Sequence, residues 1–320
     1  MVKRIGVLTS GGDAPGMNAA IRAVVRVANQ AGIEVYGIHD GYRGLVEGYI
    51  EPLTRANVAD ILDKGGTVLG SARLPEFKQP EVLEKGIHQL KKRGIEALVV
   101  IGGDGSYRGA LALSKAGINC IGLPGTIDND IPCTDFTIGF DTALNTIVEA
   151  VDKLRDTSSS HHRCSVVEVM GNRCGDLALW AGIACGAEVV VTAQTGFEET
   201  EVLERLKEFD VVKKKCHAIV IISEKITDVE AFAKKVSLNT GFSGRATVLG
   251  HVQRGGSPTP TDRVLASRMG EKAVELLIQG IGGQCVGIKD NAIISVPIEE
   301  ALDLPRTSRR KMYGLFERLV

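Results

Sequence analysis

Three glycine-rich segments of the chain carry carboxylates and hydroxyls that could handle a phosphate group. They are residues 9–18 (TSGGDAPGMN), 101–107 (IGGDGSY) and 122–130 (GLPGTIDND), and each includes or follows a short apolar run typical of a buried strand. Ligands of open α/β sheets bind outside the carboxyl ends of the strands. Glycines there let backbone N–H groups approach a phosphate, and the following helix offers its positive N-terminus. The three segments therefore predict a site for a polyphosphate.

The third segment holds a compact set of groups suited to acid–base chemistry. Thr126, Asp128 and Asp130 point to one side if the backbone is extended. One carboxylate could then accept a proton from a substrate hydroxyl, a role that is worth about 10²–10⁴-fold in rate. In the second segment, Asp104 suits Mg²⁺, which bridges carboxylate and phosphate oxygens. The alternatives are turns that bind no ligand, with Asp104 as the cap of a helix.

The first segment departs from two common nucleotide-binding motifs. No lysine follows Gly16, so the segment is not a GxxxxGK[ST] loop, and its glycines at positions 11, 12 and 16 do not fit GxGxxG. An NAD-dependent oxidoreductase would carry GxGxxG after the first strand and an acidic residue near the end of the second. The sequence therefore disfavours that class of enzyme.

Two hydrophobic patterns indicate the elements that must position these segments. Continuous apolar runs predict buried parallel strands at residues 5–9, 35–38, 97–101, 118–123, 166–169, 189–192 and 218–222. Apolar residues at helical spacing predict amphipathic helices over residues 17–28, 144–154 and 264–277. The alternation of strands and helices predicts a doubly wound α/β fold, and 320 residues favour two such domains.

Composition excludes several classes of protein. Hydrophobic residues make up 44% of the chain and the net charge is −1, so no overall field favours nucleic acid or an anionic membrane. A single Trp provides no stacking platform for nucleic acid, and no run of apolar residues is long enough to span a membrane. Residues 1–4 (MVKR) lack the apolar region of a signal peptide. The seven cysteines form no CxxC pair, which favours reduced, buried thiols in a cytoplasmic protein.

A fourth segment, residues 249–258 (LGHVQRGGSP), completes a pattern that points to one family. With residues 9–18, 102–106 and 124–130, it resembles the loops of the bacterial ATP-dependent 6-phosphofructokinases (phosphofructokinase A family), and the similarity runs from residue 3 to about residue 300. The resemblance implies two Rossmann-like three-layer α/β/α domains with mostly parallel sheets. Residues 1–139 plus 254–304 would form the ATP-binding domain, and residues 140–253 plus 305–320 the fructose 6-phosphate and effector domain.

The resemblance also implies the reaction and the residues that perform it. The γ-phosphoryl of ATP would pass to the 1-hydroxyl of fructose 6-phosphate in glycolysis, with Asp128 as general base and Mg²⁺ on Asp104. The catalytic set would be Asp128, Thr126, Asp130, Arg73 and Gly12, and ATP would contact Gly12, Tyr42, Arg73, Leu74, Gly103, Asp104, Gly105 and Ser106. The sugar phosphate would contact Thr126, Asp128, Arg163, Met170, Gly171, Asn172, Glu224, Arg245, His251 and Arg254. Arginine suits this role because it binds phosphate with two parallel hydrogen bonds, and the resemblance implies that Arg163 and Arg245 act across a homotetramer interface.

A second anion site is indicated by two arginines on the first predicted helix. Arg22 and Arg26 are four residues apart, on the side opposite the apolar face, and their mutual repulsion is also tolerable on a plain solvated face. The resemblance implies an effector site, activated by ADP and inhibited by phosphoenolpyruvate, in which Glu188 would hold a metal. Its residues would be Arg22, Arg26, Arg55, Arg155, Gly186, Glu188, Lys213, Lys215 and His217.

Three departures from the family pattern bear on these expectations. Asn172 stands where an arginine is usual, so either Arg173 replaces the missing guanidinium or the contact is weaker. Cys216 replaces a lysine of the basic stretch 213–217, and residues 209–212 lack the usual Arg/Gly-rich lead-in, which makes the allosteric response less certain than catalysis. The tail from Arg306 carries no motif and is most simply a solvated helix.

Two related activities compete with this reading. Pyrophosphate-dependent relatives usually carry Asp at position 105 and Lys at position 125, and glycine at both positions here favours ATP. A non-catalytic regulatory subunit should lack Asp128 or Asp104, and both are present.

Overall fold

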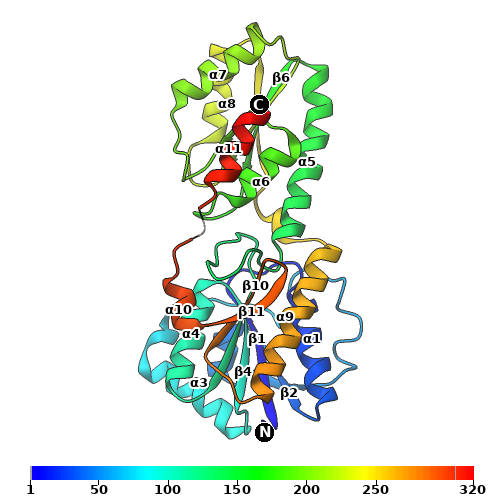
Figure 1. The fold of residues 1–320 in the computed structure, drawn as a ribbon, viewed down its shortest axis with the longest axis vertical. Helices are drawn as coiled ribbons and strands as arrows, with labels where there is room; N and C mark the ends of the chain where they lie inside the picture. Colours follow the sequence, from blue (N-terminus) through cyan, green and yellow to red (C-terminus); the bar gives the residue numbers. More distant parts are fainter. Residues whose placement is uncertain (1, 307) are drawn as a thin grey trace. The chain divides into compact units, whose positions relative to one another are not determined.

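The computed structural model describes residues 2–306 and 308–320 (Figure 1). The chain folds into two compact units. Unit 1 comprises Met1–Thr142 and Arg254–Arg306, and unit 2 comprises Ala143–Gln253 and Thr307–Val320. The predicted domain boundaries were 139/140, 253/254 and 304/305. Each unit is built on a mostly parallel sheet with helices against it, which confirms the predicted fold class.

Unit 1 contains the larger sheet, with seven strands among the described residues. The strand order is β11-β10-β5-β4-β1-β2-β3, and only the two edge strands, β3 and β11, run antiparallel to their neighbours. The strands are β1 (Arg4–Ser10), β2 (Glu34–Ile38), β3 (Ile50–Leu53), β4 (Ala97–Gly102), β5 (Asn119–Pro124), β10 (Gln284–Lys289) and β11 (Ala292–Pro297). The apolar runs that predicted β1 and β4 are buried on both faces, as expected of central parallel strands.

The register of the central strands places their carboxyl ends side by side. Ser10 at the end of β1 pairs with Gly102 at the end of β4, which in turn pairs with Pro124 at the end of β5. The three glycine-rich segments therefore begin at one edge of one sheet.

Helices cover both faces of this sheet. In Figure 1, α1 (Met17–Gln30) and α9 (Pro260–Ile278) lie on one side, and α3 (Pro80–Lys92) and α4 (Asp104–Lys115) lie on the other. The α1–α9 contact is close because Gly270 faces Ala23: a Cβ at Gly270 would lie 2.7 Å from the Ala23 Cβ. The remaining helices of unit 1 are α2 (Gly41–Glu47), α10 (Ile298–Asp303) and the 3₁₀ turn η1 (Pro75–Lys78).

Asp262, buried at the start of α9, fixes the segment by which the chain leaves unit 1. Its Oδ1 accepts a hydrogen bond from the backbone N–H of Gly139 at 2.9 Å. Its Oδ2 accepts bonds from the backbone N–H of Thr142 at 2.8 Å and from the Thr142 hydroxyl at 2.6 Å. Burial raises the pKa of Asp262 to about 6, although the hydrogen bonds from Thr142 and Gly139 act in the opposite direction.

Unit 2 contains a parallel sheet that has four strands in the described part of the chain. The order is β7-β8-β6-β9, formed by β6 (Arg163–Val169), β7 (Val189–Val191), β8 (Ala218–Ser223) and β9 (Ser243–Val248). Its helices are α5 (Phe140–Ser160), which begins in unit 1, α6 (Asp176–Cys185), α7 (Glu199–Val211), α8 (Val229–Asn239) and α11 (Arg310–Leu319). The 3₁₀ turn η2 (Gly250–Arg254) follows β9.

The C-terminal tail corrects one expectation. It does form a helix, α11, but this helix is docked on unit 2 rather than solvated. Phe316 is buried, the Tyr313 hydroxyl hydrogen-bonds the Thr192 hydroxyl at 2.7 Å, and Arg309 binds Asp176 with both Nε and Nη2. Asp176 lies in the first turn of α6, so the ion pair ties the tail to that helix.

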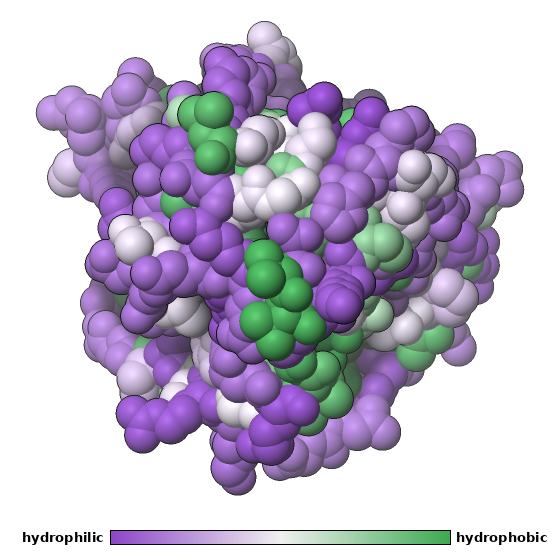
Figure 2. All heavy atoms as spheres, turned by 90° about the horizontal axis from the view of Figure 1, so that it is seen from above, coloured by the Kyte–Doolittle hydropathy of each residue, from purple (hydrophilic) through white to green (hydrophobic). Residues whose placement is uncertain are grey.

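Figure 2 shows one face, on which a few apolar side chains form a narrow strip among hydrophilic ones. No helix in the described residues is long and apolar enough to cross a membrane. Six of the seven cysteines are buried as predicted, whereas Cys216 is exposed.

Candidate functional site

The first two glycine-rich loops are joined directly at the carboxyl edge of the unit 1 sheet. The Ser106 hydroxyl donates to the carbonyl of Ser10 at 3.0 Å. A third segment joins them, because the Ser71 hydroxyl donates to the carbonyl of Gly11 at 2.6 Å. This bond brings the exposed Arg73 and the half-buried Leu74, both predicted ATP contacts, to the edge where the first loop lies.

Arg254 lies against the first loop. Its Nη1 donates to the carbonyl of Asp13 at 3.0 Å, and a Cβ at Gly12 would lie 2.4 Å from the same nitrogen. A side chain at Gly12 would therefore displace the Arg254 guanidinium from its place against the loop. Arg254, predicted to contact the sugar phosphate, is placed by the structure beside the loop predicted to bind ATP phosphates.

The second loop opens α4. Gly103 is the N-cap residue, Asp104, Gly105 and Ser106 form the first turn, and no atom outside the loop lies within 4 Å of a Cβ at Gly105. The N–H groups of a first helical turn lack partners within the helix and carry a partial positive charge, so they suit an anion. Tyr42 supports this loop from the core: it is 4% exposed, and its hydroxyl donates to the carbonyl of Ser106 at 2.6 Å. A direct contact of Tyr42 with ATP stays a prediction.

The third loop holds Asp128 in a network of buried polar groups. Thr126 and Asp128 are each 8% exposed, and the Asp128 backbone N–H donates to the Thr126 hydroxyl at 3.2 Å. Asn129, next to Asp128, adopts a left-handed backbone with φ of 51°. Its side chain accepts from the Thr137 N–H at 3.0 Å and donates to the Asp135 carbonyl at 3.2 Å. The loop is thus fixed from both sides, which holds the Asp128 carboxyl in a defined place.

Asp104 is the residue that the sequence assigns to Mg²⁺. Its carboxylate is about half exposed and pairs with Arg108, one turn along α4, at 3.2 Å. Within the described residues, no group of three or more His, Cys, Asp or Glu side chains could hold a metal ion on its own. One accessible carboxylate beside a helix N-terminus fits a magnesium ion that takes most of its ligands from phosphates and water.

In unit 2, the predicted substrate loop meets the ends of two other elements. The backbone N–H of Asn172 donates to Glu224 Oε1 at 2.8 Å, which ties the loop after β6 to the residue after β8. The backbone N–H of Met170 donates to the side chain of Gln253 at 3.0 Å. Gly171 has φ of 137°, a conformation that side chains rarely adopt. Met170, Gly171, Asn172 and Glu224 are thus brought together, and His251 lies exposed in η2 with the buried Gln253.

Arg163 and Arg245 lie elsewhere in unit 2. Arg163 begins β6, whereas Met170 follows its other end. Arg245 pairs in register with Ser165, so Arg163 and Arg245 share one face of the sheet. Within this chain they lie apart from Glu224, and their predicted contact with the sugar phosphate of a neighbouring subunit stays a prediction.

The predicted effector residues fall into two clusters. In unit 1, Arg22, Arg26 and Arg55 lie close enough that burial, followed by the charges of Arg26 and Arg55, lowers the pKa of Arg22. Three like charges at one place favour an anion as their counterpart.

The unit 2 cluster contains an ion pair between the buried Glu188 and the partly exposed Lys215. Glu188 is 2% exposed and accepts from Lys215 Nζ at 2.6 Å and from the Ile219 N–H at 2.6 Å. Arg155 contacts His217 at 3.4 Å and donates to the carbonyl of Cys185, which precedes the helix-ending Gly186. Burial lowers the pKa of His217; the charge of Glu188 acts against this shift, and the charges of Arg155 and Lys215 act with it. The predicted Lys213 lies over the Phe209 ring at 4.4 Å.

Sequence reasoning missed the residues that hold the functional loops. Gln253 lies inside the fourth motif. The signal that the sequence offered was a polar residue between the apolar Val252 and Arg254. Asn129 stood between two catalytic candidates, and asparagine is a common residue at left-handed positions. For Lys225, which donates to the Asn172 side chain at 3.1 Å, no sequence signal existed.

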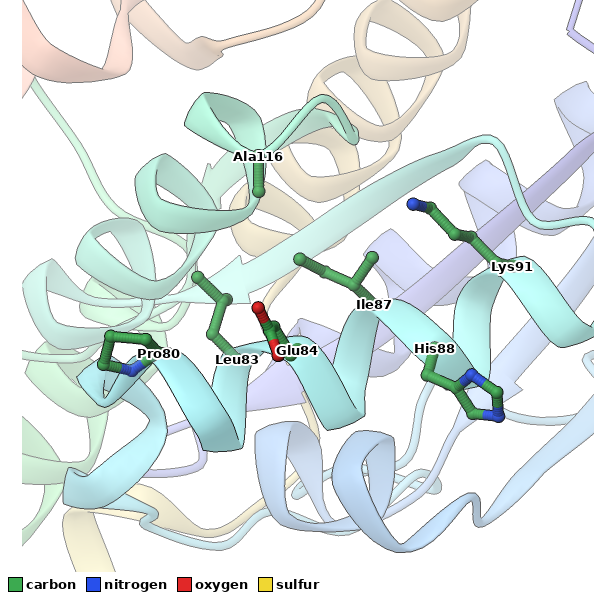
Figure 3. A pocket seen from close by; sticks show the side chains of 7 residues that line it. All are labelled: Pro80, Leu83, Glu84, Ile87, His88, Lys91 and Ala116. Atoms are coloured by element: carbon green, nitrogen blue, oxygen red, sulfur yellow. The ribbon is translucent and has the colours of Figure 1, made fainter.

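A surface pocket of about 560 Å³ lies away from all of these residues. Figure 3 shows part of its lining on α3, where Leu83 and Ile87 point toward Ala116, the residue after α4, and His88 points away from it. No predicted site residue lines it.

Comparisons with known proteins agree with this geometry. The family model described as Phosphofructokinase matches residues 4–277. A curated relative from Tolumonas auensis, named ATP-dependent 6-phosphofructokinase, is 58% identical over 98% of both chains, and one from Photobacterium profundum with the same name is 56% identical over the whole of both. The solved phosphofructokinase of Saccharomyces cerevisiae superposes with a TM-score of 0.87 at 35% identity, covering 99% of this chain and 47% of the yeast chain. A pyrophosphate-dependent phosphofructokinase from Marinobacter aquaeolei shares the fold, with a TM-score of 0.86 at 22% identity.

Two mostly parallel sheets, with glycine-rich loops at the carboxyl ends of the central strands of the larger one, define an α/β protein that handles phosphate-bearing ligands. The chain belongs to the phosphofructokinase family, as the four motifs predicted.

Proposed function

We propose that this chain is an ATP-dependent 6-phosphofructokinase, which phosphorylates the 1-hydroxyl of fructose 6-phosphate to give fructose 1,6-bisphosphate and ADP. The proposal is carried by one observation: strand register brings the first two glycine-rich loops together at one edge with the loop of Asp128. Full-length relatives of more than 50% identity that bear this name support the same activity.

Phosphoryl transfer needs positioning and charge neutralisation more than covalent help. Asp128 would accept the proton of the sugar hydroxyl as the γ-phosphoryl arrives, with Thr126 and the Asn129 network holding the loop in place. The first turn of α4, from Asp104 to Ser106, would bind ATP phosphates through its backbone N–H groups. Bound Mg²⁺, held by Asp104, would neutralise phosphate charge.

The two positions that distinguish ATP from pyrophosphate support ATP as donor. At Gly105 no neighbouring atom lies within 4 Å of a Cβ, which leaves open space in front of α4. At Gly125 a Cβ would lie 2.9 Å from Ile101 and 3.0 Å from Met17, so this backbone has no room for the lysine of pyrophosphate-dependent relatives.

The same proposal assigns roles to the two units, to the neighbouring subunits and to the two basic clusters. Unit 1 would be the ATP-binding domain, and unit 2 would bind the sugar phosphate through Glu224, His251 and the loop from Met170 to Asn172, with Arg163 and Arg245 serving a neighbouring subunit of a homotetramer. The two basic clusters would bind ADP or phosphoenolpyruvate as effectors. A cytoplasmic location fits the free cysteines and the two phosphorylated substrates.

The test is ADP release by purified protein with fructose 6-phosphate, Mg²⁺ and ATP, run beside Asp128→Asn and a parallel reaction with pyrophosphate. Asp128→Asn keeps the shape of the side chain, so we expect kcat to fall by about 10²–10⁴-fold with little change in Tm. Asp60→Asn, on an exposed segment, is the matched control and should be unchanged. Turnover with pyrophosphate but not ATP would reassign the donor. Unchanged kcat in Asp128→Asn would refute the role of that residue as the base.

A further inference from the structure

Two residues with an unusual backbone face each other at the proposed sugar end of unit 2. Asn172, after β6, has φ of 54°, and Lys225, after β8, has φ of 66°. The Lys225 ammonium donates to the Asn172 side-chain oxygen at 3.1 Å. Asparagine tolerates this left-handed region, whereas lysine visits it rarely. Such strain persists where the surrounding structure enforces it, and it concentrates at functional sites.

The same two loops are joined a second time through Glu224. Its Oε1 accepts the Asn172 backbone N–H at 2.8 Å, so the backbone of Asn172 holds Glu224 while the side chain of Asn172 holds Lys225. Glu224 and Lys225 are adjacent in the chain. A substrate hydroxyl that reaches Glu224 therefore comes near the exposed Lys225 ammonium, which is hydrogen-bonded to the Asn172 side chain.

The surrounding charge explains why a cation is needed there. Glu168, near the end of β6, is half-buried, and burial, followed by the charges of Glu224 and Asp228, raises its pKa. The carboxylates of Glu168, Glu224 and Asp228 thus place negative charge at one edge of the unit 2 sheet. A sugar phosphate is itself an anion, so it would be repelled from this edge unless a positive group lay among the carboxylates.

We infer that Lys225 is a further substrate-contacting residue, held in place by Asn172, that binds the anionic sugar phosphate beside Glu224. The inference rests on the proposed function. It assigns Asn172 a task as well: this residue positions Lys225 and does not itself neutralise charge.

The first test measures KM for fructose 6-phosphate and its Kd by equilibrium dialysis without ATP, in wild type, Lys225→Met and Lys225→Arg. Methionine keeps an unbranched side chain as far as Cε but lacks the ammonium group. We expect Lys225→Met to raise KM and Kd for the sugar about tenfold, the effect of losing one charged hydrogen bond, while KM for ATP is unchanged. Lys225→Arg should recover most of the binding. Lys234→Met, on an exposed face of α8, is the matched control.

A second variant separates binding from a structural role. Glycine adopts φ of 66° without strain, so Lys225→Gly should raise Tm while weakening sugar binding as much as Lys225→Met. A purely structural lysine would instead leave Kd unchanged.

The outcomes are distinct. If wild type turns over with ATP but Lys225→Met binds the sugar within about twofold of wild type, the inference is wrong and the proposed function stands. If wild type releases no ADP, the proposed function fails, and the dialysis measurement still shows whether Lys225 contributes to binding of fructose 6-phosphate. No binding of fructose 6-phosphate to wild type would overturn both.

Discussion

Substitution of Gly102 by alanine tests whether the contact between the first two loops assembles the nucleotide site. Gly102 ends β4 and pairs with Ser10. A Cβ there would lie 2.4 Å from the Ser10 carbonyl oxygen and 2.4 Å from the Ser106 hydroxyl, the two atoms joined by the bond between the loops. The new methyl group would therefore occupy the space of that hydrogen bond.

The expected cost follows from these contacts. Overpacking a well-packed site costs about 1–3 kcal/mol, and the lost buried hydrogen bond costs about 1 kcal/mol more. The reduced freedom of the unfolded chain returns about 0.4–1 kcal/mol, because the backbone at Gly102 is not left-handed. We expect unit 1 to lose roughly 1–3.6 kcal/mol, a fall in Tm of roughly 2–14 °C for a unit of this size.

Urea unfolding followed by far-UV circular dichroism measures this loss. The single Trp of the chain, Trp180, lies in α6 of unit 2, so its fluorescence reports the unit that the substitution does not touch. KM for ATP should also rise about tenfold as the loops move apart.

Two controls bracket the effect. Gly105→Ala adds the same methyl group where no atom lies within 4 Å, so it should not lower the unfolding midpoint and should raise it slightly by restricting the unfolded chain. Ser106→Ala removes the same hydrogen bond without adding bulk and should cost about 1 kcal/mol. A midpoint of Gly102→Ala equal to that of wild type would show that the loops tolerate separation and that the reasoning is wrong.

Three further predictions concern other parts of the chain. Asp262→Asn should cost about 1–3 kcal/mol, because an amide nitrogen would face hydrogen-bond donors. The raised pKa of Asp262, about 6, means that the folded state keeps a proton that the unfolded chain releases above about pH 4. The free energy of unfolding of the wild type should therefore fall as pH rises from about 4 to 6. Urea titrations of Asp262→Asn across this pH range should not show that fall. Arg309→Met removes three hydrogen bonds to the buried Asp176 and should cost about 3 kcal/mol, seen as faster hydrogen exchange in α11, whereas the exposed Arg310→Met should leave this exchange unchanged. Native protein should show one fast-reacting thiol with Ellman's reagent, and Cys216→Ser should abolish it; several fast thiols would contradict the burial of the other six.

Hydrophobic pattern predicted the central strands well because parallel strands covered on both faces must be apolar throughout. The strands that it missed lie at sheet edges or in the hairpin. β9 (Ser243–Val248) is an edge strand with partly exposed side chains, and β3 (Ile50–Leu53) is short and contains Pro52. Neither offers a continuous apolar run.

The β10–β11 hairpin was predictable from its turn. Asp290 and Asn291 join the strands, and both have positive φ, which suits the two-residue turn of a hairpin. Asp and Asn are common in such turns, so the sequence contained a signal that hydrophobic periodicity did not reveal.

The candidate site was predictable to the extent that it depends on strand ends and local loops. Thr126 and Asp128 lie together because three consecutive residues of one loop contain both. Contacts between distant segments were not predictable: Asn172 and Lys225 are 53 positions apart, and Met170 and Gln253 are 83 apart. Only the fold decides which loops at one sheet edge become neighbours.

The division of unit 1 into two segments of the chain has a consequence for synthesis on the ribosome. β5 ends at Pro124, and its sheet neighbour β10 begins at Gln284. At about 5–20 residues per second, the edge of β5 would wait roughly 10–30 s for its partner, while all of unit 2 except α11 emerges first. An unpaired apolar strand is a template for aggregation during that interval. Slow translation between residues 124 and 284 should therefore increase the dependence of this protein on chaperones, whereas a pause after Pro297, once the sheet is complete, should not.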